Sequence, residues 1–430
     1  MSDPIVVDVG PVQVRLSQLR YFTYTIIGVG LLWPWNCFLS AAGFYGHRLD
    51  DAPFLAKIYS STMMSVSTVT STIANVVLAR KQRGANYDKR IKVGFAITTV
   101  VFVIMALTCV IPAAIRMASP LFFVGLMVMV WLSAVATAMS QNGTMATANV
   151  LGPIYANAVM VGQAVAGVLP ATALILSIFI TGAHKQPAGG DDRDFGVFLY
   201  YLTASVIAVA AVALLVYCQR HGDHEMYQRL TAMVEGDDIE DSTVVEEPQV
   251  EVPFSVLWAR LHYIVLAIFF TFAVTLAFPV FASSVTSVRP EPRSFLYTDQ
   301  VFIPFVFFMW NIGDLAGRVL CGYPRARMLI TDPKLLFWYS LARFGFIPLF
   351  FTANLNGAGA VIKSDWWYLL LQFLFGLSNG QLATSSFMVV GDHCKSEEEK
   401  EAAGGFTTIF LSVGLMVGSL LSYLLVWMIQ

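Results

Sequence analysis

Long runs of apolar residues alternate with short polar connectors along most of the chain. Each run is long enough for a helix to cross about 30 Å of hydrocarbon, the thickness of a bilayer core. The runs lie at residues 19–42, 57–80, 91–114, 120–147, 153–181, 196–218, 260–284, 299–323, 334–354, 366–390 and 403–428. The pattern therefore predicts an all-α integral membrane protein with about eleven transmembrane helices.

One connector is much longer and more polar than the others. Residues 219–258 contain the acidic sequence EGDDIEDSTVVEEPQVEVP, and their low hydrophobicity and clustered negative charge are typical of a mostly disordered linker. We therefore divide the chain into an N-terminal cytoplasmic tail at 1–18, a six-helix bundle at 19–218, an acidic cytoplasmic linker at 219–258 and a five-helix bundle at 259–430.

Composition supports the membrane assignment and excludes several other classes. Of the 430 residues, 57% are hydrophobic and 13% are charged, whereas soluble domains carry about 25% charged residues. The net charge of −2 offers no basic face for nucleic acid, and the five scattered cysteines form no CxxC pair. The P-loop and HExxH motifs do not occur in the sequence. We expect no enzyme activity, no cofactor and no bound metal.

Basic residues gather in the connector between the second and third runs, at Arg80, Lys81, Arg83, Lys89, Arg90 and Lys92. Cytoplasmic loops of membrane proteins carry an excess of Lys and Arg. If this connector is cytoplasmic, the N-terminus and the linker are cytoplasmic as well. Eleven spans then place the C-terminus on the opposite side of the membrane.

A charged pair lies within the run at 299–323. Asp314 and Arg318 are four residues apart in NIGDLAGR, so they share one helix face and are expected to pair, and Asn311 lies on much the same face. A charge at membrane depth costs at least ~2.5–3.5 kcal/mol on the insertion scale, so each one needs a reason. One role is structural, as an ion pair between helices. We favour the other, a polar patch on a central cavity, because intramembrane ionisable groups usually face a water-filled pathway.

Other polar groups in the runs have both a structural and a functional interpretation. Arg343 in LARFGFIPLF has no obvious local partner, and a structural role is as well supported as a functional one. In GLSNGQLATSSF, Ser378, Asn379 and Gln381 either face a pathway or join helices. Gly380 lies four residues after Gly376, a spacing that lets helix backbones approach closely in lipid.

Two further segments have side chains that suit a planar, polar ligand. Gln141 in AMSQNGTMATANV offers a donor and an acceptor that can match the edge of a nucleobase, although an interhelical hydrogen bond is the simpler role. In GVGLLWPWNCFLSA, Trp33 and Trp35 flank a proline and precede Asn36. These indoles belong either to an interfacial aromatic belt or to a face that stacks on a base.

Taken in order, six segments resemble the equilibrative nucleoside transporter family. They are LLWPWNCFLSA, SQNG, GPIYANAVMVGQAVAGVLPA, NIGDLAGR, ARFGFIPLF and GLSNGQLATSSF, and together with their surroundings they cover nearly all of the chain apart from the termini and the linker. The resemblance implies a major-facilitator-like arrangement of six plus five helices. It also implies facilitated diffusion of nucleosides, with nucleobases as further candidates, by alternating access.

The resemblance also implies roles for individual residues. It points to Leu32, Trp35, Gln141, Asp314 and Arg318 as substrate-binding residues of a cavity, with Gln141 at the base and the charged pair near the ribose hydroxyls. A gating or structural role is expected for a second set, in which the first four match family motif positions: Asn36, Asn311, Asn379, Gly380 and Arg343.

The chain departs from animal plasma-membrane members of the family in one respect. Its connector at 43–56 is short and has no glycosylation sequon. This favours a fungal or other microbial member in the vacuole or another internal membrane over the plasma membrane. We also expect uptake without an obligatory proton gradient. Two alternatives remain: a major-facilitator-type carrier of sugars or another polar metabolite, and a membrane receptor without transport. The oligomeric state stays open.

Overall fold

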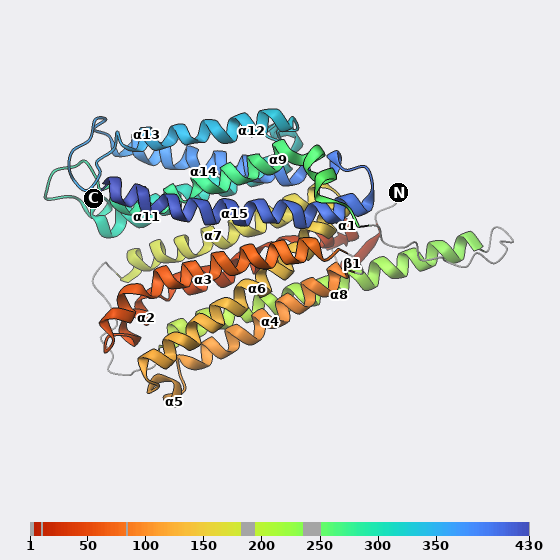
Figure 1. The fold of residues 1–430 in the computed structure, drawn as a ribbon, viewed down its shortest axis with the longest axis horizontal. Helices are drawn as coiled ribbons and strands as arrows, with labels where there is room; N and C mark the ends of the chain where they lie inside the picture. The colour runs from red at the N-terminus through yellow and green to blue at the C-terminus, as the bar shows by residue number, and fades with distance from the viewer. Residues whose placement is uncertain (1–3, 10–11, 83–84, 182–193, 235–250, 430) are drawn as a thin grey trace.

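The computed structural model describes residues 4–9, 12–82, 85–181, 194–234 and 251–429, and it is built almost entirely of helices. In the N-terminal half, the helices are α1 Leu16–Ser40, α2 Ala42–Arg48, α3 Pro53–Arg80, α4 Tyr87–Thr108, α5 Pro112–Ile115, α6 Ser119–Leu151, α7 Pro153–Thr181 and α8 Phe195–Val234. Figure 1 shows the long helices lying side by side, with the end of α8 projecting beyond the others.

The C-terminal half contains more breaks than the N-terminal half. Its α-helices are α9 Phe254–Thr275, α10 Ala277–Ser284, α11 Asp299–Gly322, α12 Pro333–Ala342, α13 Phe346–Phe350, α14 Asp365–Met388 and α15 Glu397–Ile429. Short 3₁₀ turns lie at η1 Phe295–Tyr297, η2 Pro324–Ala326, η3 Arg343–Gly345 and η4 Gly391–His393. Helix α9 ends at Thr275, four residues before Pro279, where the proline ring clashes with the carbonyl of residue i−4 and disfavours a continuous helix.

The prediction of about eleven membrane helices agrees with this arrangement. Nine helical segments of the described residues are long and apolar enough to cross a membrane. The predicted spans at 334–354 and 366–390 correspond to α12 to α13 and to α14. The first is divided by the turn η3, and the second carries many buried polar side chains, which lowers its hydropathy. Both nevertheless lie alongside the other helices of the C-terminal half (Figure 1).

The structure corrects two details at the ends of the predicted bundles. Helix α8 continues to Val234 and α9 begins at Phe254, so helical structure extends on both sides into the expected linker. Residues 235–250, with most of the acidic sequence, lie outside the described residues. The expected N-terminal tail contains two antiparallel strands, β1 Ile5–Val9 and β2 Val12–Arg15. The sequence analysis did not predict these strands.

The start of α1 and the end of α15 lie at opposite ends of the helix bundle (Figure 1). This is the relation expected from an odd number of crossings. We call the end where α8 leaves the bundle and α9 enters it the linker end, and the other the distal end.

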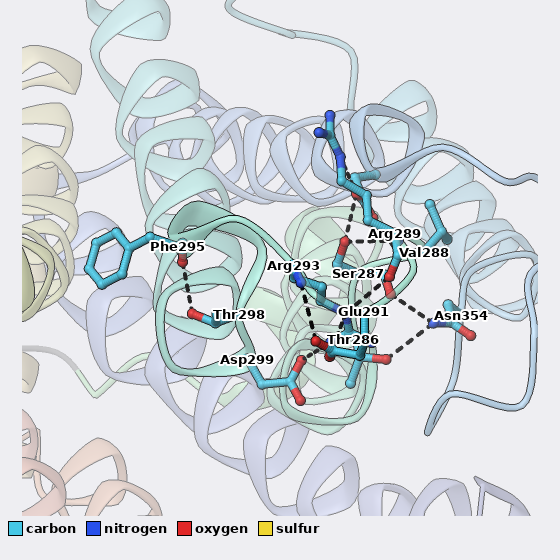
Figure 2. Close-up of polar contacts among 11 residues, drawn as sticks. Thr286, Ser287, Val288, Arg289, Glu291, Arg293, Phe295, Thr298, Asp299 and Asn354 are labelled. Carbon is cyan, nitrogen blue, oxygen red and sulfur yellow. Dashed lines mark hydrogen bonds and ion pairs between the residues drawn. The ribbon is translucent and has the colours of Figure 1, made fainter. Parts of the chain in front are cut away.

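At the distal end, side-chain hydrogen bonds fix the connector between α10 and α11. Asn354 donates to the carbonyl of Ser287 at 3.1 Å, and Arg293 donates to Asp299 at 3.0 Å, as Figure 2 shows. Asp365, the first residue of α14, accepts from the hydroxyl of Ser287 at 2.8 Å. These bonds brace the distal ends of α10, α11 and α14 against one another.

Candidate functional site

A cavity of about 220 Å³ lies between the two halves of the molecule. Helices α1, α3, α6 and α7 supply its wall from the N-terminal half, while α9 and α15 supply its wall from the C-terminal half. Three of the predicted substrate-binding residues line it: Leu32, Trp35 and Gln141. The structure therefore brings the predicted aromatic and amide groups from α1 and α6 together around one space.

Two polar stripes run along the walls of this cavity. On α3, Ser67, Ser71 and Asn75 recur every four residues, and all three line the cavity. On α6, the same spacing joins Ser133 and Thr137 to Gln141. Side chains four residues apart lie on one face of a helix, so each stripe presents hydroxyl groups followed by an amide. The sequence analysis missed the hydroxyl groups, although their spacing was visible in the sequence.

The rest of the lining is largely apolar, and one more amide joins it. Leu31, Leu32, Trp35, Phe38, Phe272, Leu276, Leu411 and Leu415 contribute apolar and aromatic surface. Gln163 on α7, which the sequence analysis did not single out, is a third amide beside Gln141 and Asn75. A mostly apolar space with a few convergent polar groups is the usual form of a small-molecule site.

The two indoles of the first helix have different surroundings. Trp35 lines the cavity, whereas Trp33 is 8% exposed and packs within the N-terminal half. The indole nitrogen of Trp33 donates to the hydroxyl of Thr203 at 2.8 Å, and its ring lies 5.7 Å from that of Tyr200. Of the two tryptophans, only Trp35 is thus placed to meet a ligand in this cavity.

The predicted pair of Asp314 and Arg318 is formed, but it lies outside the set of residues that line the cavity. Both side chains are buried, and Nε of Arg318 lies 2.9 Å from Oδ2 of Asp314. Nδ2 of Asn379 on α14 donates to Oδ1 of Asp314 at 2.6 Å. The carboxylate therefore receives both an ion pair within α11 and a hydrogen bond from the neighbouring helix.

Arg318 also joins the two halves of the molecule. Its Nη1 donates to the carbonyl of Met160 on α7 at 2.9 Å, and its own carbonyl accepts from Nδ2 of Asn157 at 2.8 Å. The hydroxyl of Tyr21 on α1 donates to Oδ1 of Asn157 at 3.2 Å. A chain of polar contacts thus runs from α1 through α7 to the ion pair on α11.

Glycine allows α11 and α14 to lie unusually close together around this pair. A Cβ atom at Gly380 would overlap the main-chain carbonyl of Asp314, and one at Gly317 would overlap that of Leu377. Glycines on both helices therefore bring their backbones into contact, as expected for small residues in membrane helices. Asn379, the residue before Gly380, lies at this close contact between the helices. Its side-chain oxygen accepts a 2.6 Å hydrogen bond from the hydroxyl of Thr275 on α9.

The remaining predicted residues lie within helix contacts. Asn36 donates to the carbonyl of Ala166 at 2.8 Å and joins α1 to α7. Asn311 donates to the carbonyl of Phe307 in its own helix at 2.8 Å, and its side-chain oxygen lies against Gly167 of α7.

Arg343 is fully buried in the C-terminal half. Its guanidinium donates to Ser378 at 3.0 Å and to the main-chain carbonyls of Thr271 and Phe375 at 2.9 and 3.3 Å. It also lies 4.6 Å from the ring centroid of Phe375. These contacts join η3 to α9 and α14, which is a structural arrangement.

Contacts between the two halves gather at the linker end. Asn75 on α3 donates to Ser412 on α15 at 2.6 Å, and Asn149 on α6 donates to the carbonyl of Lys400 at 3.2 Å. Close to the latter, a Cβ atom at Gly404 would overlap the backbone of Ala146 on α6. Helices α3 and α6 are therefore packed tightly against the start of α15 on this side of the cavity.

A second contact at the linker end involves the residues that lead into α9. The side-chain amide of Gln82, after α3, accepts from the main-chain nitrogen of Val252 at 2.9 Å and donates to its carbonyl at 3.3 Å.

Within the described ranges, no group of three or more His, Cys, Asp and Glu side chains is placed to hold a metal ion. The cavity is thus lined by amides, hydroxyl groups, aromatic rings and aliphatic side chains, and the ion pair lies outside this lining.

Comparison with known proteins gives consistent matches over most of the chain. A family model described as "Nucleoside transporter" matches residues 127–427. "Nucleoside transporter FUN26" of Saccharomyces cerevisiae is 39% identical over 98% of this chain and 87% of that protein. "Equilibrative nucleoside transporter 1" of Mus musculus is 26% identical over 94% and 96%, respectively. A solved structure of the E. coli fucose:proton symporter FucP aligns with a TM-score of 0.49 and 14% identity, covering 94% of this chain and 90% of that one.

Proposed function

Because this chain belongs to the nucleoside transporter family, we propose that it carries nucleosides across a membrane by facilitative transport. The observation that carries the proposal is the cavity between the two halves, in which Trp35 and three amides surround one space. A nucleoside has a flat base and a ribose rich in hydroxyl groups. Aromatic surface suits the first, and amides and hydroxyl groups suit both.

Individual residues then take separate roles in binding. Leu32 and Trp35 pack against the planar base, while Gln141 donates to and accepts from its polar edge. The hydroxyl groups along α3 and α6 meet the ribose. Uncharged polar groups can satisfy the substrate in this way because a nucleoside carries no formal charge.

Transport proceeds by alternating access, with the two halves moving around a site near the middle of the membrane. The hydrogen bonds of Asn75 with Ser412 and of Asn149 with Lys400 support a state closed at the linker end. Opening that end requires α3 and α6 to separate from α15. It also requires α7 to move away from α11.

The Asp314–Arg318 pair contributes to the same movement in our proposal. In the closed arrangement, Arg318 is bonded to Met160, and neither charged residue lines the cavity. Separation of α7 from α11 would release the Nη1 donor of Arg318 toward the substrate pathway. The pair then binds ribose hydroxyl groups while the substrate passes. This agrees with the position near the ribose that the family resemblance implies for the pair.

The charge pattern and the helix arrangement support a proposed orientation in the membrane. We place the linker end and the N-terminus in the cytoplasm, because the basic connector between α3 and α4 lies at that end. The six helices before the linker and the five after it act as the two moving bundles. The short distal connector without a sequon favours an internal membrane, such as the vacuolar membrane, over the plasma membrane.

Uptake of radiolabelled uridine and adenosine into proteoliposomes tests the proposal. Saturable uptake is expected, and Gln141→Ala should raise the KM for uridine about tenfold, the effect of losing one hydrogen bond worth ~1.4 kcal/mol. Gln300→Ala, an exposed position in the first turn of α11, provides a matched control and should leave the KM unchanged. If folded wild-type protein takes up neither nucleoside, the proposal is wrong and another polar metabolite becomes the better candidate.

A further inference from the structure

The side-chain amide of Asn75, at the edge of the cavity, makes a hydrogen bond with only one of its two polar atoms. Asn75 is 3% exposed and lines the cavity from α3. Its Nδ2 donates to Oγ of Ser412 on α15 at 2.6 Å. Its Oδ1 is buried and has no hydrogen-bond partner in the part of the chain that the structure describes. Buried acceptors are nearly always paired in native proteins, so this oxygen requires an explanation.

Asn75 and Gln141 are the last residues of α3 and α6 that line the cavity in the direction of the linker end. The guanidinium of Arg90 donates both to the carbonyl of Leu78, three residues after Asn75, and to the side chain of Asn142, the residue after Gln141. This shared partner joins α3 to α6 just beyond the two amides. The amides of Asn75 and Gln141 therefore both end their polar stripes on the linker side of the cavity.

We propose that Asn75 recognises the base of the transported nucleoside, with Oδ1 accepting a hydrogen bond from an N–H group on the base edge beside Gln141. This inference rests on the proposed nucleoside transport. The edge of a nucleobase carries donors and acceptors side by side in one plane. In uracil, the N3–H group lies between two carbonyl oxygens, so an acceptor from Asn75 and a donor from Gln141 match adjacent positions.

Ser412 is a positioning residue in this arrangement. Its hydroxyl oxygen occupies the donating end of the Asn75 amide, so the accepting end remains for the substrate. The same amide therefore touches the substrate with one atom and the opposite bundle with the other. Recognition of the base thus takes place at a contact that must break when the linker end opens.

The test compares uridine with analogues that lack one donor each. Full-length protein in proteoliposomes is assayed for inhibition of radiolabelled uridine uptake by unlabelled uridine, N3-methyluridine and 2′-deoxyuridine. In the wild type, N3-methyluridine should inhibit about tenfold more weakly than uridine. In Asn75→Ala, inhibition by unlabelled uridine should weaken by a similar factor. Uridine and N3-methyluridine should then inhibit uptake equally well. The ratio between uridine and 2′-deoxyuridine should not change.

Two further variants serve as controls. Asn75→Asp keeps one oxygen for the base and another that accepts from the Ser412 hydroxyl, so it should retain the preference for uridine. Thr72→Ala, on the same helix but outside the cavity lining, should behave as the wild type. If Asn75→Ala does not fold, Asn75→Leu fills a similar volume without an acceptor. Where uptake is too slow, the thermal stabilisation of purified protein by uridine and by N3-methyluridine gives the same comparison.

Several outcomes would overturn the inference without affecting the proposed transport. One is an unchanged preference for uridine over N3-methyluridine in folded Asn75→Ala. Another is a change confined to 2′-deoxyuridine, which would place Asn75 at the ribose. Wild-type protein that takes up no nucleoside would instead overturn the transport proposal itself.

Discussion

Arg318 on α11 donates a 2.9 Å hydrogen bond from Nη1 to the main-chain carbonyl of Met160 on α7, and its Nε lies 2.9 Å from Asp314. One guanidinium therefore serves both as the partner of a buried carboxylate and as a bond between the two halves of the molecule. The ion pair and the interbundle contact consequently depend on the same side chain.

Replacement of Arg318 by alanine should impair folding and transport together. The variant leaves the carboxylate of Asp314 buried without its ionic partner, and breaking a buried pair typically costs about 3–5 kcal/mol. We expect a lower melting temperature in detergent and loss of uridine uptake. Asp314→Asn, which keeps a neutral acceptor beside Asn379, should lose uptake while the protein still reaches the membrane. Normal uptake by Asp314→Asn would contradict a role for the charge.

The contact between α11 and α14 should not tolerate a methyl group at Gly380. A Cβ atom there overlaps the carbonyl of Asp314, and the backbone of a neighbouring helix cannot move aside cheaply. Gly380→Ala should destabilise the protein by at least about 1–3 kcal/mol, the usual range for overpacking. Gly125→Ala, where nothing lies within 4 Å of the added atom, is the matched helix control. Equal melting temperatures for the two variants would argue against the close contact.

Of the two tryptophans of α1, Trp35 should affect substrate affinity and Trp33 should affect stability. Trp35→Ala removes aromatic surface from the cavity and should raise the KM for uridine while the protein remains folded. Trp33→Ala removes a packed side chain and its bond to Thr203, so it should lower stability by about 3–5 kcal/mol. Uptake kinetics and thermal unfolding of both variants separate the two effects. The reverse assignment would show that Trp35 is the packing residue.

Arg343 should matter for stability and not for substrate affinity. Its guanidinium is held by Ser378 and by the carbonyls of Thr271 and Phe375, away from the cavity. Arg343→Met keeps much of the volume but leaves these acceptors without their donor, at a cost of about 1–3 kcal/mol for each buried group. We expect a lower melting temperature and an unchanged KM in the protein that folds. A large increase in KM would place Arg343 in the substrate pathway.

Uridine uptake should not depend on an imposed pH gradient. Asp314 is paired with Arg318 and accepts a hydrogen bond from Asn379, and neither Asp314 nor Arg318 lines the cavity. The described cavity lining holds only uncharged side chains, so an uncharged nucleoside can bind there without a coupled proton. Initial rates should be equal with and without the gradient, and a protonophore serves as the control. Uptake that requires the gradient would contradict this prediction.

The regular features of the fold could be predicted because they depend on local sequence. Helix number follows from the length of the apolar runs, and the pairing of Asp314 with Arg318 follows from their spacing within one helix. The lengths of the apolar runs also predicted the span that is divided at Arg343 and the polar span that contains Asn379. The strands at Ile5–Val9 and Val12–Arg15 were missed, since segments of four or five residues give too little pattern to separate them from a tail.

The sequence by itself determined the class of this protein, its helices and the chemical groups that lie within them. Only the tertiary structure decided which of those groups share a space. Leu32, Trp35 and Gln141 line one cavity. Asp314 and Arg318 instead form hydrogen bonds where α11 packs against α7 and α14. The physical reason is that spacing fixes the face of a helix but not the neighbour that this face meets. That choice depends on close packing between helices distant in sequence, such as the approach of Gly380 to Asp314.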